Sequence, residues 1–244
     1  MIQCVTFKMM PKDTSYYDAE SGIYSAKRYP RVVTTYVQSF YQSRLRTLTS
    51  AVRGKVRQGG TMIELGCADG VVTRALYDLF HNVFSEVVGV DISRGMIERA
   101  KEMSSDRNIK FFLREEGCQW SRYDLVVEVG VINYADAERE LEFARTIVHP
   151  DGVYICSVAG RDSLWHRLKP EDKRFRNFLL YSEYEELMRK HFFIASTSSV
   201  GLFIPHIWKV PAVARIVQPL IELVLRRIAP NLFQEKVYVL RPLP

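Results

Sequence analysis

Cysteine is scarce in this chain, and its arrangement does not indicate a disulfide scaffold or a zinc site. The four cysteines are spread over 244 residues, and no two form a C-x-x-C pair. This distribution is typical of reduced thiols in a cytoplasmic protein. No group of residues has the spacing of metal ligands, so we predict no metal site.

Long apolar runs are also missing. No uninterrupted apolar stretch approaches the ~20 residues that cross a bilayer, and residues 1–12 lack the apolar core of a signal peptide. We therefore expect a cytoplasmic protein with no transmembrane segment, and at most a peripheral contact with the inner membrane surface. The formal net charge of +6 is mild, so nucleic acid is not the expected partner.

What the chain does have is a strand, a glycine loop and a helix start in close succession. The apolar run Thr61–Leu65 stops at Gly66, and a helical pattern opens at Val71, just after Gly70. Because glycine has no Cβ, the backbone at these two positions can turn sharply and lie close to a ligand. Asp91 ends the next predicted strand, where a carboxylate is placed to bind a ribose.

The charges of the loop help to distinguish a dinucleotide ligand, which carries a pyrophosphate, from a cationic nucleoside ligand. Glu64 and Asp69 flank a loop whose spacing is not G-x-G-x-x-G, and carboxylates there repel phosphate and suit a cationic ligand. The segment resembles the E-x-G-x-G-x-G loop of class I S-adenosylmethionine-dependent methyltransferases, whose donor carries a sulfonium and an ammonium but no phosphate. Ala68 replaces the family's middle glycine. Its added methyl group should slightly narrow the backbone's approach to the donor without removing the site.

The resemblance extends over residues 61–157 and includes three further segments, at 108–115, 123–131 and 149–152. It implies that Asp91 binds the ribose, that Glu115 meets the adenine amino group and that Val129 lies beside the methionine moiety. The donor-binding residues it implies are Tyr16 and Arg28 from an N-terminal cap, then Glu64, Gly66, Cys67, Ala68, Gly70, Asp91, Ile92, Met96, Glu115, Glu116 and Val129.

Four of these residues have alternative explanations. Asp91 is alternatively explained as an acid that stabilises a helix N-terminus. Glu64 is alternatively explained as a buried acid paired with the cap. Glu115 would also be a solvated loop charge. Cys67 is better explained as a small turn residue than as a nucleophile, since no basic partner lies near it in sequence.

The order of the elements predicts an α/β fold with a doubly wound, mostly parallel seven-stranded sheet, the Rossmann-like methyltransferase fold. Residues 1–60 form an N-terminal helical cap, residues 61–160 the donor-binding core, and residues 161–244 an acceptor-side region that completes the sheet. The predicted helices cover residues 32–57, 72–84, 94–103, 135–148 and 181–191, and 150–152 is a predicted turn. The cap's tyrosines either close over the donor or pack on the sheet edge.

Residues 200–233 form a predicted helical insertion, with Pro219 expected to kink or divide the helix. Its apolar positions make one stripe: Val213, Ile216, Val217, Leu220, Val224 and Ile228. Three roles are open for this amphipathic segment: a substrate lid, a basic patch on a membrane surface, or a helical pair packed on the core.

Methyl transfer from a sulfonium is an in-line displacement, so the protein mainly has to position the acceptor. Tyr134 and His166 are the candidate catalytic residues, and we assign no general base. The resemblance implies transfer to O or N of a small-molecule, sugar or lipid-linked acceptor. The alternatives are a methyltransferase-fold partner that binds the donor without turnover, and an RNA methyltransferase, although an Asn-Pro-Pro-Tyr signature is absent.

Overall fold

A computed structural model describes residues 14–114, 120–168 and 175–244 of the chain. Its centre is one seven-stranded sheet with the order β3-β2-β1-β4-β5-β7-β6. The strands are β1 Gly60–Leu65, β2 Phe84–Asp91, β3 Lys110–Leu113, β4 Tyr123–Val129, β5 Val148–Ala159, β6 Phe192–Val200 and β7 Glu235–Pro242. β7 runs antiparallel to β5 and to β6, and the other four strand pairs of this sheet are parallel, so the predicted fold class is confirmed.

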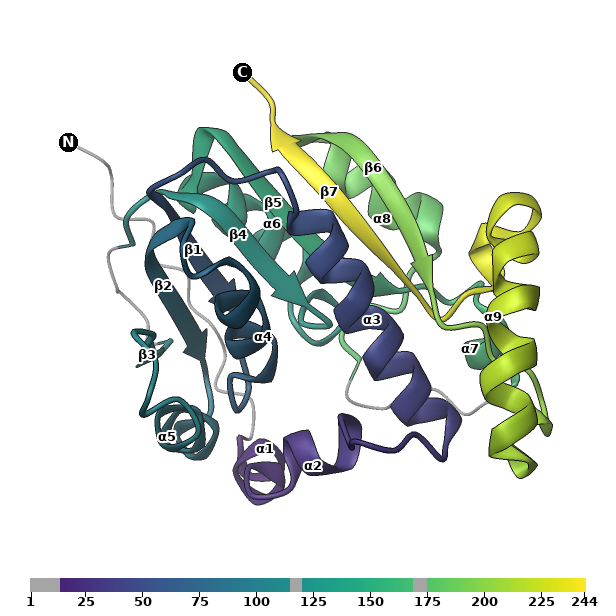
Figure 1. The fold of residues 1–244 in the computed structure, drawn as a ribbon. Coiled ribbons are helices and arrows are strands. Elements are labelled where there is room, and N and C mark those ends of the chain that lie inside the picture. Colours follow the sequence, from purple (N-terminus) through teal and green to yellow (C-terminus); the bar gives the residue numbers. More distant parts are fainter. Residues whose placement is uncertain (1–13, 115–119, 169–174) are drawn as a thin grey trace.

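Helices cover both faces of the sheet (Figure 1), because the strands carry apolar side chains on both. Met62 of β1 packs in the cluster that includes α3 and α4, whereas Ile63 packs in the cluster that includes α6 and α8. The helices are α3 Tyr36–Val52, α4 Val71–Phe80, α5 Arg94–Glu102, α6 Ala137–Ile147, α7 Leu164–Leu168 and α8 Tyr181–Arg189.

Several predicted boundaries differ from the structure. The first helix of the core ends at Phe80, and Phe84 already belongs to β2. β5 begins at Val148, so the expected turn at 150–152 lies within this long strand. The predicted helix over 32–57 starts later, at Tyr36, because Thr35 and Gln38 form a capping box there.

Two short helices, α1 Ser15–Glu20 and α2 Tyr24–Arg28, precede α3. Figure 1 shows them beside α5 across the ends to which the arrows of β1 and β2 point. This end of a parallel sheet is where ligands bind in doubly wound folds. The N-terminal segment therefore lies at the end of the sheet where the donor site is predicted (Figure 1).

The insertion forms α9, Pro211–Ile228, which runs through Pro219 without a break. The expected division of the helix is wrong; Pro219 is exposed, so water can bind the Arg215 carbonyl that a proline leaves without an N–H partner. The helix faces the protein through its three buried positions, Ala214, Gln218 and Glu222, and most of its apolar stripe is exposed. In the part of the chain described, no helix is both long enough and apolar enough to cross a bilayer.

Candidate donor-binding site

The predicted donor site lies where the strand order reverses. β1 pairs with β2 on one side and with β4 on the other, with Leu65 opposite Glu128. Gly66 and Val129 therefore follow at the same edge of the sheet, and Asp91 ends the adjacent β2 at that edge. Doubly wound sheets open a crevice for ligands at such a switch point.

The loop after β1 depends on left-handed backbone conformations at three positions. Gly66 has φ +69°, Gly70 has φ +76° and Ala68 has φ 49°. A Cβ at Gly66 would lie 2.2 Å from a methyl group of Val131, and one at Gly70 would lie 2.9 Å from the Phe111 ring. Glycine is thus required by the backbone and by neighbouring side chains, where the sequence had suggested close approach to a ligand.

Asp91 connects the end of β2 to this loop. One carboxylate oxygen accepts a hydrogen bond from the Ala68 N–H at 2.8 Å, and the other accepts one from the Ser93 N–H at 2.9 Å. Burial raises the pKa of Asp91, while these backbone N–H groups act in the opposite direction. Each oxygen keeps a further lone pair, so the carboxylate can also accept hydrogen bonds from ribose hydroxyls.

The N-terminal cap is fastened to the loop and to α5 by two residues that sequence reasoning did not select. Asp18 of α1 accepts hydrogen bonds from the Ser93 hydroxyl at 2.5 Å and from the Gly95 N–H at 3.1 Å. Ser25 of α2 donates to the Asp69 carboxylate through both its hydroxyl and its N–H. Local sequence carries no signal for these contacts, because each joins residues more than 40 positions apart.

The two cap residues predicted from sequence occupy other places. Tyr16 is 40% exposed on α1 and makes an edge contact with Tyr17. The Arg28 guanidinium lies 3.9 Å from the centre of the Tyr24 ring and pairs with Glu20 at 3.2 Å. Arg28 thus stabilises the cap itself, and its contact with the donor stays a prediction.

Glu64 is a buried acid beneath the loop. It accepts a hydrogen bond from the Thr73 hydroxyl of α4. Burial raises the pKa of Glu64 to about 8, and the charge of Asp91 acts in the same direction, while Thr73 and Arg44 lower it. A cationic ligand beside Glu64 would favour its ionised form, so binding and deprotonation would be coupled.

The remaining predicted positions differ in accessibility. Cys67 is buried, and burial raises the pKa of its thiol, as suits a turn residue and not a nucleophile. Ile92 and Val129 are half-buried at the sheet edge, whereas the Met96 side chain is only 1% exposed. Glu115 and Glu116 lie outside the described residues.

The two candidate catalytic residues meet at one aromatic cluster. The Phe175 ring centre lies 4.9 Å from that of Tyr134 and 5.7 Å from that of His166. His166 Nδ1 lies 3.2 Å from the Gly160 carbonyl oxygen and 2.8 Å from the Ser163 hydroxyl. Because a carbonyl only accepts, this contact favours a proton on Nδ1 and a lone pair on Nε2, as a general base needs.

A buried ion pair connects α3 with β7. Arg44 of α3 lies 3.2 Å from the Glu235 carboxylate of β7. The Ser157 hydroxyl donates to Glu235 at 3.0 Å and accepts from the Gly130 N–H at 3.0 Å. This network joins α3 to the ends of β4 and β5.

Within the described ranges, no cluster of His, Cys, Asp and Glu side chains is placed to hold a metal ion.

Comparison with known families agrees with this geometry. A family model described as a methyltransferase domain matches residues 37–199. The chain belongs to this family. The match spans the glycine loop, Asp91 and the ends of β4 and β5, so the predicted resemblance to class I S-adenosylmethionine-dependent methyltransferases is confirmed.

Individual relatives of this methyltransferase-family chain are distant. A malonyl-[acyl-carrier protein] O-methyltransferase of Anoxybacillus flavithermus is 28% identical over 116 residues, which are 47% of this chain and 44% of that protein. The chain therefore matches less than half of that relative's length. Two solved structures share the fold, each covering over nine-tenths of both chains. A methyltransferase in complex with the Haloferax volcanii Trm112 activator has TM-score 0.65 and 20% identity. The magnesium protoporphyrin IX methyltransferase of Synechocystis, solved with SAH, has TM-score 0.63 and 14% identity.

Proposed function

We propose that this protein transfers a methyl group from S-adenosylmethionine, in line, to an oxygen or nitrogen of a small-molecule, sugar or lipid-linked acceptor. The observation that carries the proposal is the Asp91 carboxylate, which is hydrogen-bonded across the switch point to the loop at Ala68. In this proposal residues 1–60 cap the site, residues 61–160 bind the donor and residues 161–244 shape the acceptor side.

The residues would divide the work by charge and position. Asp91 would accept hydrogen bonds from the ribose, and the buried Glu64 would favour the cationic end of the donor. The bound donor supplies an already activated methyl group, so the protein needs only to hold the acceptor in line with it, an effect worth ~7–11 kcal/mol. The cap, fastened through Asp18 and Ser25, would exclude water from the crevice.

On the acceptor side, the cluster around Phe175 supports a flat or apolar acceptor, with Tyr134 and His166 at its edges. Where the acceptor is a hydroxyl, His166 Nε2 would take its proton. The Anoxybacillus relative, which matches part of this chain, is named as an O-methyltransferase. A His166→Gln variant should then lose turnover while donor affinity is unchanged.

Calorimetric titration of the purified chain with S-adenosylmethionine and with SAH tests the proposal. Asp91→Ala should weaken binding roughly tenfold to a hundredfold, since it removes hydrogen bonds to a charged group. Asp106→Ala, which changes an exposed carboxylate just beyond α5, is the matched control and should bind like the wild type. Absence of binding heat with the wild type would end the proposal.

Binding alone does not establish transfer, so turnover is measured separately. Incubation with methyl-labelled donor and a crude metabolite extract should move label into an extractable product. Donor that is bound but never consumed would favour the alternative of a non-catalytic partner, which Ala68 in the loop motivates. RNA binding that weakens steeply with salt would favour an RNA methyltransferase.

We also propose that the chain works in the cytoplasm, in peripheral contact with the inner membrane surface. The mild positive charge and the amphipathic α9 support this location.

A further inference from the structure

Most of the apolar stripe of α9 is exposed. Its side chains are 49% exposed at Val213 and 72% exposed at Ile228. The exposed apolar members on or just before the helix are Val210, Val213, Ile216, Leu220, Leu223, Val224 and Ile228. At the three- and four-residue spacings of a helix, most of these side chains lie on one face. A contiguous apolar surface of this kind marks an interaction site.

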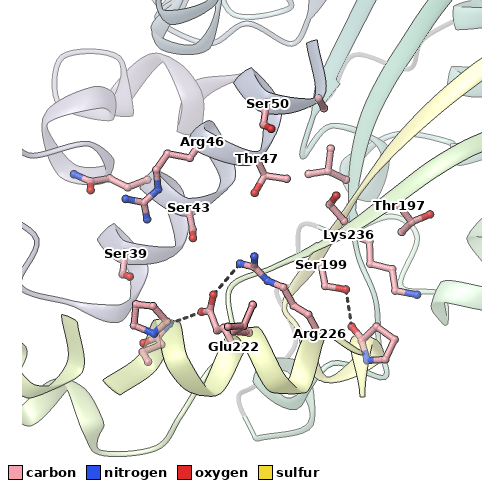
Figure 2. Close-up of a pocket in the computed structure, with 18 of the residues that line it drawn as sticks. Ser39, Ser43, Arg46, Thr47, Ser50, Thr197, Ser199, Glu222, Arg226 and Lys236 are labelled. Carbon is pink, nitrogen blue, oxygen red and sulfur yellow. Dashed lines mark hydrogen bonds and ion pairs between the residues drawn. The ribbon is translucent and has the colours of Figure 1, made fainter. Parts of the chain in front are cut away.

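A polar network holds α9 in this orientation. Gln218 accepts a hydrogen bond from the Trp208 indole N–H at 2.7 Å and donates to Glu222 at 2.8 Å. Glu222 also accepts from the Leu202 N–H at 3.2 Å. It pairs with Arg226 at 3.0 Å (Figure 2). Rotating the helix to bury its apolar stripe would break these contacts and leave buried polar groups without partners.

The groove beside α9 is lined by polar and apolar side chains alike, and Leu220 and Leu223 border it, so it gives the stripe only partial cover. This groove of about 1450 Å³ separates α9 from α3 and from strands β6 and β7. Figure 2 shows that hydroxyl and charged side chains line it, among them Ser39, Ser43, Thr47, Ser50, Thr197, Ser199 and Lys236. The described part of the chain therefore leaves most of the apolar face uncovered.

The charges around α9 select the occupant. Lys209, Arg215, Arg226 and Arg227 are exposed, whereas the lone acidic residue of segment 200–234, Glu222, is buried and paired. An apolar face flanked only by cations complements an anionic bilayer, in which acyl chains lie below phosphate groups. A second copy of the chain fits less well, because symmetric pairing would bring the same cations together.

We propose that α9 docks on an anionic phospholipid bilayer, with Ile216, Leu220 and Val224 inserted at the level of the upper acyl chains. Lys209, Arg215 and Arg227 then lie near the lipid phosphates. This contact rests on the membrane location proposed above and specifies it. It does not depend on the methyl donor, so it can fail or hold separately from the proposed activity. It would also bring the protein to lipid-linked acceptors.

Vesicle flotation of the full chain tests the proposal. The protein should float with vesicles of phosphatidylcholine mixed with phosphatidylglycerol, and much less with phosphatidylcholine alone. The double variant Ile216→Glu, Leu220→Glu should weaken this binding at least about tenfold. Arg215→Gln and Arg227→Gln should each weaken it roughly fivefold, and only on the anionic vesicles.

Leu79→Glu is the matched control, since Leu79 is 58% exposed on α4, far along the chain from α9. It should bind vesicles like the wild type. Circular dichroism and SAH calorimetry check that every variant is folded. Failure of the wild type to float, or equal flotation of the double variant, would overturn the proposal. So would light scattering that shows a dimer which the double variant dissociates, since a second copy would then cover the stripe.

Discussion

At the scale of single residues, Ala68 holds a conformation that is costly for any side chain. Its φ of 49° lies in the left-handed region, which costs an L-residue about 1–2 kcal/mol. Glycine would remove this strain, although the added freedom of the unfolded chain takes back about 0.5–1 kcal/mol. The Ala68 N–H, which binds Asp91, is kept in either residue.

Ala68→Gly should therefore raise the free energy of unfolding by about 0.5–1 kcal/mol in urea titrations. Ala75→Gly is the control within α4, where the same change should lower stability by about 1 kcal/mol. A loss of stability in Ala68→Gly as large as in the control would mean that the loop is not strained at this position.

Glu64 should make stability depend on pH. Its pKa is about 8 in the folded protein and about 4.3 in the unfolded chain. The folded state therefore holds a proton that the unfolded state releases, so Glu64's contribution is complete at low pH and is lost as the pH rises towards 8. The slope is at most about 1.4 kcal/mol per pH unit.

Glu64→Gln keeps an acceptor for the Thr73 hydroxyl and removes this titration. The stability of the variant relative to the wild type should thus increase steadily between about pH 5 and pH 8. Urea titrations at several pH values measure it. A difference that stays constant over this range would show that Glu64 is already ionised in the folded protein.

At the scale of elements, the Arg44–Glu235 pair fixes α3 to β7. Both side chains are under a tenth exposed, so removing one partner leaves an uncompensated buried charge. Arg44→Met should lower the free energy of unfolding by about 3–5 kcal/mol. Adding Glu235→Gln should recover much of that loss.

Arg57→Met is the comparison for the ion pair, because Arg57 is 71% exposed beside Asp124. An exposed pair contributes about 1 kcal/mol or less. Chemical unfolding of the four proteins measures the difference. Equal losses for Arg44→Met and Arg57→Met would contradict a structural role for the buried pair.

At the scale of the whole molecule, binding of the product should stabilise the fold. With SAH at about a hundred times its dissociation constant, the folded state gains about 2.7 kcal/mol. For a chain of this size the melting temperature should rise by roughly 5–10 °C. Asp91→Ala should show little shift at the same concentration, and an equal shift would place the product elsewhere in the protein.

Much of this architecture was predictable because its signals are local. The loop Gly66–Gly70 follows an apolar strand, and Asp91 ends the next one, so both had to meet at one edge of a parallel sheet. The cap contacts of Asp18 and Ser25 and the pair of Arg44 with Glu235 were not predictable. Each joins residues separated by 44 to 191 positions, and hydrogen-bonding capacity alone does not select a partner.

The helix α9 separates what the sequence determined from what the tertiary structure decided. Periodicity indicated an amphipathic helical segment within residues 200–233, because side-chain spacing is a local property. The direction of its apolar face was decided by Trp208, Gln218 and Glu222, whose hydrogen bonds hold the polar face inward. A hydrophobic pattern states which residues share a face, and only the partners available in space decide which way that face points.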